Sequence, residues 1–347
     1  MLLATLVEGV ATRRPDHLAL VDGDRAFTYA QLEAARNRVA GALAASGLVP
    51  GDRLAVLSPN CAELVITYHA AFRAGVAVVP INTRLLATGV AYVLEHCDAT
   101  ALVVHRDRLD RLPAAGCPPP ARTWVIGGDP ADGDAAAFDA LLAGDADVPA
   151  PEVGIDDVAA LLYTSGTTSN PKGVTHTHAT LWNTAANQAW TQEFGADDTH
   201  LISLSAAHIA GFAGQVLTAA YAGGTAVMIA DPTPQSLLDA VVRHRPTFLQ
   251  MTPAILAQML DEVTDPAQLS SVRCCLAGGD KVPQGTHDHF RRITGHDVTE
   301  VCGMTETFSY LMNPPFGEHR TGSIGVPAHG TRVRLVGPDG AEPPTGE

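Results

Sequence analysis

A segment rich in hydroxyl groups and glycine carries the clearest chemical signal in this 347-residue chain. It reads YTSGTTSNPKG, spans residues 163–173 and follows the apolar run AALL. Backbone N–H groups and hydroxyls can donate to phosphate oxygens, glycine lets a polyphosphate come close, and Lys172 adds a positive charge. The segment therefore predicts a phosphate-binding loop. Its candidate binding residues are Thr164, Ser165, Gly166, Thr167, Thr168 and Lys172.

The sequence around the lysine argues against one common class of phosphate site. ATPases with a strand–loop–helix arrangement carry G-x-x-x-x-G-K-[ST], whereas here Pro171 precedes Lys172 and Gly173 follows it. The only other lysine of the chain is Lys281. We therefore expect a phosphate-binding loop between two strands, and a solvated Ser/Thr turn without a ligand is the alternative.

Two later apolar runs are followed by residues that could also bind a ligand. Gly278, Gly279 and Asp280 follow VRCCLA, and Thr305 and Glu306 follow VCGM. Ligands of open α/β sheets bind beyond the carboxyl ends of the strands, which makes the first group a candidate binding edge. The alternatives are a tight turn for the two glycines and a helix N-cap for the Thr–Glu pair.

Taken together, these segments resemble the adenylate-forming superfamily of acyl-CoA synthetases, aryl-CoA ligases, luciferases and peptide-synthetase adenylation domains. The loop at 163–173 is similar to the family's phosphate-binding signature, and FTYAQL (27–32), AGVAVVPIN (74–82), GMTE (303–306) and GSIGVP (322–327) are similar to further family elements in the same order. The resemblance covers essentially the whole chain and corresponds to the family's large N-terminal domain. It implies ATP- and Mg²⁺-dependent activation of a carboxylic acid to an acyl-adenylate, with release of pyrophosphate and transfer to CoA.

The resemblance also implies a role for each candidate residue. Glu306 is similar to the family's metal-binding acid and Thr305 to the residue that hydrogen-bonds the α-phosphate; one carboxylate with phosphate oxygens and waters suffices for Mg²⁺. His208 resembles a residue of the acyl site, where we expect it to position the substrate; a structural histidine is the alternative. The implied catalytic residues are Lys172, Thr305, Glu306 and His208. The further implied nucleotide-binding residues are Gly278, Gly279, Asp280, Val301, Cys302, Gly303 and Thr305.

Two residues depart from the family pattern. Many relatives place a tyrosine against the adenine ring where this chain has Cys302, and Ser169 stands where the phosphate loop usually has glycine. Cys302 has no basic neighbour in the sequence, so we interpret it as a packing residue. The family's small C-terminal domain, with its adenylation lysine, would begin after Glu347. Three functions remain open: a CoA ligase, an enzyme that transfers the acyl group to a carrier protein or another nucleophile, and a binding-only homologue.

The elements that must hold these residues follow from the hydrophobic pattern. Residues 30–46 carry apolar side chains at three- and four-residue spacing and predict a helix. Short runs rich in Val, Leu and Ile alternate with helix-like segments, which is typical of parallel sheets with crossover helices. We expect an α/β protein of two layered subdomains with mainly parallel sheets flanked by helices, plus the start of a small β subdomain. The expected boundaries are 1–157, with a loop-rich boundary at 106–157, then 158–318 and 319–347.

The same pattern makes two local predictions in the second half of the chain. A helix is expected near residues 212–221, between the strand-like runs HLISLS and TAVMIA. The segment RVRLVGPDG, which begins at residue 332, predicts a strand followed by a turn.

Composition limits the partners and the location of the protein. Asp and Glu outnumber Lys and Arg by 37 to 22, which argues against nucleic acid as a partner. The six cysteines form neither a CxxC pair nor a zinc-like Cys/His spacing, so we expect a reduced, cytoplasmic protein. We find no signal-peptide pattern and no membrane span. The expected partners are a small carboxylic acid, ATP and CoA, with a carrier protein as the alternative acceptor; an oligomer is compatible with the sequence.

Overall fold

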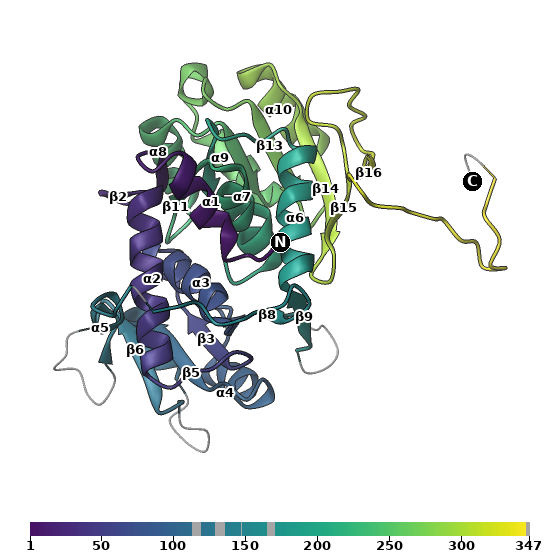
Figure 1. Cartoon of the computed structure of the whole chain (residues 1–347). Helices are drawn as coiled ribbons and strands as arrows, with labels where there is room; N and C mark the ends of the chain where they lie inside the picture. Colours follow the sequence, from purple (N-terminus) through teal and green to yellow (C-terminus); the bar gives the residue numbers. More distant parts are fainter. Residues whose placement is uncertain (113–118, 129–135, 147, 165–170, 345–347) are drawn as a thin grey trace.

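Two sheets with flanking helices make up the molecule (Figure 1). The computed structural model describes residues 1–112, 119–128, 136–146, 148–164 and 171–344. Most strand pairs within the two sheets run parallel, as expected where helices connect successive strands. The α/β class and the mainly parallel sheets predicted from the sequence are confirmed.

The smaller sheet carries the phosphate-loop hairpin at one edge. Among the described residues its strand order is β7-β6-β5-β3-β4-β8-β9, with all neighbours parallel except the antiparallel pair β8 and β9. The strands are β3 (Arg53–Leu57), β4 (Ala77–Pro80), β5 (Ala101–His105), β6 (Arg122–Ile126), β7 (Ala136–Ala137), β8 (Val158–Tyr163) and β9 (Gly173–Thr177). The central strands are almost entirely buried, which explains their continuous apolar sequence.

The larger sheet carries the other predicted site segments. Within the described part of the chain its order is β16-β15-β14-β13-β12-β10-β11-β1-β2, and the pairs that include β2, β15 or β16 are antiparallel. The strands are β1 (Leu18–Asp22), β2 (Arg25–Thr28), β10 (Thr199–Ile202), β11 (Thr225–Met228), β12 (Phe248–Met251), β13 (Cys274–Gly278), β14 (Val298–Met304), β15 (Phe308–Met312) and β16 (Val326–Pro327). The carboxyl ends of β13 and β14 therefore lie side by side.

The helices begin and end at recognisable sequence signals. Thr28 and Gln31 form a capping box at the start of α2, and Gly75, with φ of +69°, ends α3. The α-helices are α1 (Thr5–Arg13), α2 (Tyr29–Ala45), α3 (Ala62–Ala74), α4 (Ala87–His96), α5 (Asp139–Leu142), α6 (His178–Thr191), α7 (Thr218–Ala222), α8 (Pro234–His244), α9 (Pro253–Asp261) and α10 (Gln284–Thr294). Short 3-10 helices span Arg106–Arg111 and Pro266–Leu269. In the described residues, no helix has the length and apolar character needed to cross a membrane.

Each sheet contains strands that are far from its other strands in the sequence. Strands β1 and β2, near the N-terminus, pair into the larger sheet through β11, whereas β8 and β9 extend the smaller sheet through β4. The strands thus cross the boundary expected at residue 157. The cause is physical: a strand joins the sheet that buries its apolar face, and the partner that offers this burial can be far away in sequence.

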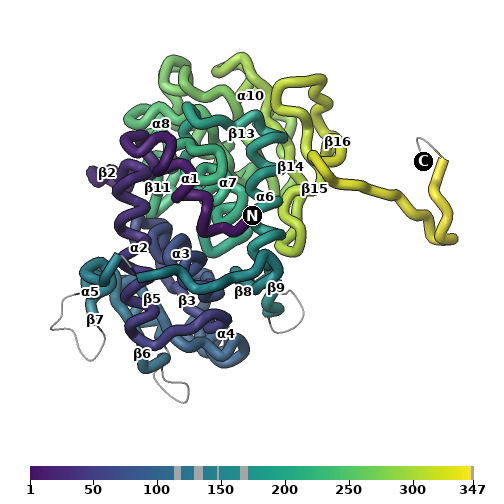
Figure 2. Tube along the Cα trace, in the orientation of Figure 1, coloured from purple at the N-terminus to yellow at the C-terminus, as the bar shows by residue number. Residues whose placement is uncertain are grey.

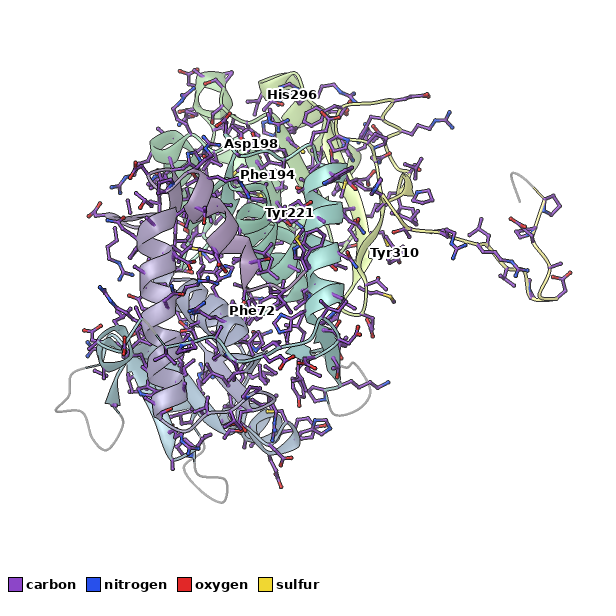
Figure 3. All side chains as sticks on the ribbon, in the orientation of Figure 1. Phe72, Phe194, Asp198, Tyr221, His296 and Tyr310 are labelled. Atoms are coloured by element: carbon purple, nitrogen blue, oxygen red, sulfur yellow. The ribbon has the colours of Figure 1, made fainter. Side chains whose placement is uncertain are left out.

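A shared core joins the two sheets in the middle of the molecule. Tyr68 and Phe72 on α3 pack edge-on against Phe212, with ring centroids 5.0 and 6.3 Å away, and Phe72 also contacts the ring of His178 at the start of α6. Phe72 is labelled in Figure 3. These side chains are fully or almost fully buried. The core therefore holds the smaller sheet's hairpin at a defined position relative to the larger sheet.

The helix expected near residues 212–221 has a different geometry at its start. Residues Ala210–Leu217 form a π-helix, which continues as α7. A Cβ atom on Gly211 would lie 2.3 Å from the carbonyl oxygen of Ser205, so glycine is required for the close approach of the preceding loop. π-helical turns are rare and frequent at functional sites. The apolar spacing predicted a helix, but it does not distinguish a wide helical turn from an ordinary one.

The last described residues leave the body of the protein (Figure 2). The strand expected from residue 332 is wrong, because residues 331–337 have no regular secondary structure. No described strand lies beside this segment to accept and donate its backbone hydrogen bonds, and a lone strand is not stable in water. The turn expected after it does form, with the Gly337 N–H donating to the carbonyl of Ala341 at 2.8 Å.

Candidate active site

The phosphate-loop segment is a β-hairpin, as predicted. Tyr163 at the end of β8 pairs with Gly173 at the start of β9, and the Thr164 N–H donates to the carbonyl of Lys172 at 3.0 Å. Lys172 is exposed. Four predicted binding residues, Ser165, Gly166, Thr167 and Thr168, lie outside the described residues. The neck of the hairpin is thus closed by backbone hydrogen bonds directly beside Lys172.

Helix α4 supports this neck through two side chains that the sequence did not single out. The Tyr163 hydroxyl lies 2.7 Å from Nδ1 of His96, and the Tyr92 hydroxyl donates to the carbonyl of Pro171 at 3.1 Å. Tyr92 and His96 stack on each other, with ring centroids 5.2 Å apart. Their four-residue spacing places them on one face of the helix, and this was the only sequence signal that pointed to them.

Thr305 and Glu306 lie in the turn between β14 and β15. Glu306 is exposed and Thr305 is half-buried. The helix N-cap considered from the sequence is excluded, because a strand precedes the turn and another follows it. Glu306 thus presents an exposed carboxylate in a hairpin turn, and its metal-binding role stays a prediction.

The predicted binding edge forms where β13 and β14 end. Gly278 pairs with Val301, and a Cβ atom on Gly278 would lie 2.6 Å from the Val301 carbonyl oxygen. Gly279 follows with φ of +86°, a conformation that favours glycine. The Asp280 carboxylate accepts a hydrogen bond from the Lys281 N–H at 2.7 Å. The structure thus brings together the two predicted groups, Gly278 to Asp280 and Val301 to Gly303.

One histidine joins the hairpin to the turn. Nε2 of His176, on β9, lies 2.9 Å from the carbonyl oxygen of Thr305. His176 is buried, and burial lowers its pKa, although the Thr305 carbonyl and the Glu306 charge act in the opposite direction. This contact connects the segment of Lys172 with the segment of Glu306. Sequence reasoning missed it, because one histidine within a five-residue strand carries no pattern of its own.

His208 lies two residues before the π-helix and makes a local contact. Its Nδ1 accepts from the Ala210 N–H at 3.4 Å; the side chain is exposed, and desolvation by its surroundings lowers its pKa. The π-helix packs against β15. A Cβ atom on Gly214 of the π-helix would lie 2.3 Å from the ring of Phe308 on β15. His208 and Glu306 therefore belong to neighbouring segments, and substrate positioning by His208 stays a prediction.

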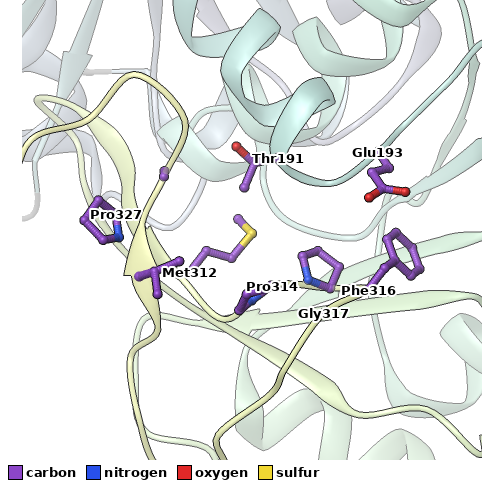
Figure 4. Close-up of a pocket in the computed structure, with 10 residues that line it drawn as sticks. Thr191, Glu193, Met312, Pro314, Phe316, Gly317 and Pro327 are labelled. Atoms are coloured by element: carbon purple, nitrogen blue, oxygen red, sulfur yellow. The ribbon is translucent and has the colours of Figure 1, made fainter.

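A surface pocket of about 240 Å³ lies away from these residues (Figure 4). Its walls include Thr191, Glu193, Met312, Pro314, Phe316 and Pro327. Met312 ends β15, whereas the turn with Glu306 precedes the beginning of that strand. The pocket therefore lies at the opposite end of β15 from the turn, and it contains none of the predicted site residues.

The described side chains do not enclose a metal by themselves. Among those residues, no group of three or more His, Cys, Asp or Glu side chains could hold a metal ion. A cation bound here would need oxygens from a ligand in addition to Glu306, and Mg²⁺ commonly binds through one or two carboxylates and substrate phosphates.

The sequence of this chain matches a known protein family. Residues 7–347 match the family described as AMP-binding enzyme. The chain belongs to this family. The resemblance inferred from the phosphate loop and the GMTE segment is thereby confirmed, and both segments fall within the matched residues.

Relatives within the AMP-binding enzyme family are CoA ligases for several types of acid. The chain is 32% identical over 345 residues to a 3-hydroxybenzoate–CoA ligase of Aromatoleum sp. (strain CIB), covering 97% of this chain and 64% of that protein. It is 31% identical to a feruloyl-CoA synthase of Amycolatopsis sp., covering 97% and 66%. A long-chain-fatty-acid–CoA ligase of Mycobacterium tuberculosis is 31% identical over 91% of this chain and 63% of that protein. The chain thus spans about two thirds of the length of these relatives.

Solved structures of AMP-binding enzymes share the fold. An anthranilate CoA ligase in complex with anthranoyl-AMP superposes with a TM-score of 0.91 at 27% identity, covering 100% of this chain and 68% of that chain. A benzoate CoA ligase from Burkholderia xenovorans LB400 gives a TM-score of 0.89 at 27% identity, covering 100% and 70%. The fold described above is therefore that of the corresponding part of these ligases.

Proposed function

We propose that this chain binds ATP and a largely apolar carboxylic acid and joins them into an acyl-adenylate, as part of an acid–thiol ligase that passes the acyl group to CoA. The observation that carries the proposal is the contact between His176 and Thr305 at 2.9 Å. It holds the hairpin with Lys172 beside the turn with Glu306, and these are the two segments expected to meet a metal-bound polyphosphate.

In the first step of the proposed reaction, a carboxylate oxygen of the acid attacks the α-phosphorus of ATP. The bond from this phosphorus to the bridging oxygen of the β-phosphate breaks, and pyrophosphate leaves. Lys172 supplies positive charge to the phosphates, Thr305 donates its hydroxyl to the α-phosphate, and Glu306 would hold Mg²⁺. When bound, Mg²⁺ neutralises charge on the departing pyrophosphate. Thr164 and the residues of the loop would contribute further donors.

The second step transfers the acyl group. The CoA thiol loses its proton to solvent and its sulfur forms a bond with the carbonyl carbon of the acyl-adenylate. AMP leaves as the bond from that carbon to the phosphate oxygen breaks. We assign Gly278, Gly279, Asp280, Val301, Cys302 and Gly303 to the nucleotide, and His208 to positioning of the acid. ATP and CoA are cytoplasmic reagents, and we propose a cytoplasmic location for the protein. Transfer to a carrier protein is the alternative second step.

Pyrophosphate release by the complete natural protein tests the first step. The panel contains aromatic, short-chain, medium-chain and long-chain acids, each with ATP and Mg²⁺. We expect acid-dependent release that falls at least about a hundred-fold in Lys172→Ala and Glu306→Ala, because each loses a charge that acts on the leaving group. Lys281→Ala is the matched control, since Lys281 is also exposed and is the only other lysine of the sequence.

The outcome separates the open functions. Release with any acid, followed by thioester formation with CoA, supports the ligase. Release with transfer only to a carrier-protein phosphopantetheine supports the alternative acceptor. ATP binding without release for every acid of the panel would contradict adenylation and favour a binding-only homologue.

A further inference from the structure

The strand after the GMTE turn contains an irregularity beside the candidate nucleotide edge. Cys302 pairs with Leu311, but the next residue of β14, Gly303, pairs with Ser309. Tyr310 is therefore an extra residue on β15, which makes this a β-bulge. Its carbonyl accepts the Ala328 N–H at 3.0 Å, which fixes the backbone of the bulge from the other side. Bulges are common next to active sites, where they redirect a side chain.

The side chain of Tyr310 lies beside Cys302, the position at which this chain lacks an aromatic ring. The Cys302 thiol donates to the Tyr310 hydroxyl, with the sulfur and oxygen 3.0 Å apart, so both side chains lie on the same side of the β14–β15 pair. Both residues are half-exposed, in contrast to Phe308 and Ser309, which are buried. Figure 3 labels Tyr310, which lies on β15, the strand between β14 and β16. An aromatic side chain next to a small one is thus partly exposed on this strand pair.

We propose that Tyr310 supplies the aromatic surface against which the adenine base of the nucleotide lies, in place of a large side chain at Cys302. The inference rests on the proposed function, since it requires a nucleotide at the edge formed by Gly278 and Val301. A tyrosine ring offers a flat apolar face for a purine. With its oxygen accepting the Cys302 thiol, the phenol hydrogen can still donate to a ring nitrogen or a ribose oxygen.

Binding measurements with the complete natural protein test this assignment. The ligands are ATP, AMP and inorganic tripolyphosphate, and the variants are Tyr310→Leu and Tyr310→Phe. We expect Tyr310→Leu to weaken ATP and AMP binding by roughly ten-fold or more, because base–aromatic stacking is lost. Tripolyphosphate, which has no base, should bind all forms equally. Tyr310→Phe keeps the ring and should stay within roughly three-fold of the wild type. If Tyr310 had only a structural role, Tyr310→Leu would weaken the binding of all three ligands together.

A fluorescent base analogue and a rescue variant give independent readouts. The emission of 2-aminopurine riboside triphosphate should be quenched on binding to the wild type and to Tyr310→Phe, and much less in Tyr310→Leu. Adding Cys302→Tyr to Tyr310→Leu should restore ATP affinity, because it returns a ring to the same side of the strand pair.

The failure of this inference differs from the failure of the proposed function. If the wild type binds ATP and Tyr310→Leu binds it equally well, the base does not lie on Tyr310 and the inference is overturned. If the wild type binds neither ATP nor AMP, the proposed nucleotide site itself is wrong.

Discussion

Nε2 of His176, on a strand of the smaller sheet, lies 2.9 Å from the carbonyl oxygen of Thr305, in a turn between two strands of the larger sheet. A carbonyl oxygen only accepts, so Nε2 carries the proton and donates. Burial lowers the pKa of His176, which keeps the ring neutral near pH 7. This hydrogen bond joins the phosphate-loop hairpin to the turn of Glu306.

Removing the hydrogen bond between His176 and Thr305 should impair the reaction with ATP more than it lowers the stability of the protein. A hydrogen bond of this kind is worth about 0.5–1.5 kcal/mol, so we expect His176→Ala to raise KM for ATP by roughly two- to ten-fold and to lower acid-dependent pyrophosphate release. His176→Gln can donate from its amide and should recover part of the loss. His296→Ala, at an exposed position, serves as the control. An unchanged KM in His176→Ala would show that the contact does not position the turn.

Gly214 on the π-helix and Phe308 on β15 are in tight contact. Phe308 is buried and has φ of +58°, an unusual conformation for a bulky residue. A Cβ atom at Gly214 would lie 2.3 Å from Cζ of Phe308, so Gly214→Ala must displace the ring. We expect unfolding by urea to show a loss of about 1–3 kcal/mol, and a narrower range of acids to be activated.

Gly285→Ala is the matched control for Gly214→Ala. Gly285 lies in α10 and a Cβ atom there would meet no heavy atom within 4 Å. Alanine in a helix is better than glycine by about 0.5–1 kcal/mol, so this variant should be slightly more stable than the wild type and keep the same acid range. Equal stability of Gly214→Ala and wild type would mean that Phe308 moves without cost.

The hydrogen bond from Tyr92 on α4 to the neck of the hairpin should strengthen ATP binding, because it holds the backbone next to Lys172. Tyr92→Phe removes the hydroxyl that donates to the Pro171 carbonyl, next to Lys172, but keeps the ring that stacks on His96. We expect ATP affinity to fall by roughly two- to five-fold, with a change in unfolding free energy below about 1 kcal/mol. Calorimetric titration with ATP measures the first and urea unfolding the second. A loss of stability without a loss of affinity would assign Tyr92 to packing alone.

His69 should make the protein less stable in acid. It is fully buried, both ring nitrogens lack a hydrogen-bond partner in the described structure, and burial, aided by the charge of Arg36, lowers its pKa to about 3. The unfolded chain binds this proton near pH 6.5, so the stability contribution is full above that pH and declines as pH falls towards 3. Between pH 7.5 and 5 the decline should be about 2 kcal/mol.

Urea unfolding at the two pH values tests the role of His69. His69→Leu removes the titrating group and keeps an apolar side chain, so the difference between pH 7.5 and 5 should shrink by about 2 kcal/mol. His296→Leu, at an exposed position, should leave the difference as in the wild type. If His69→Leu shows the wild-type difference, another group accounts for the acid sensitivity.

Local sequence was sufficient to predict many of the elements and to name candidate site segments. The helix expected at 30–46 is α2, Tyr29–Ala45, because apolar spacing and the Thr28–Gln31 cap are local properties. The phosphate-loop hairpin and the glycines after β13 also depend on residues that are adjacent in the chain, so these segments could be predicted, and a chemistry proposed for them, without a structure.

Tertiary structure decided which of these segments meet. β1 pairs with β11 about two hundred positions away, His176 contacts Thr305 across 129 positions, and the bulge at Tyr310 depends on how β15 is held between β14 and β16. Such contacts form because distant apolar faces are buried together, and no local pattern records which distant partner provides the burial. The sequence by itself therefore determined which residue types are available for chemistry, and the fold determined that the hairpin meets the turn of Thr305 and that β13 ends beside β14.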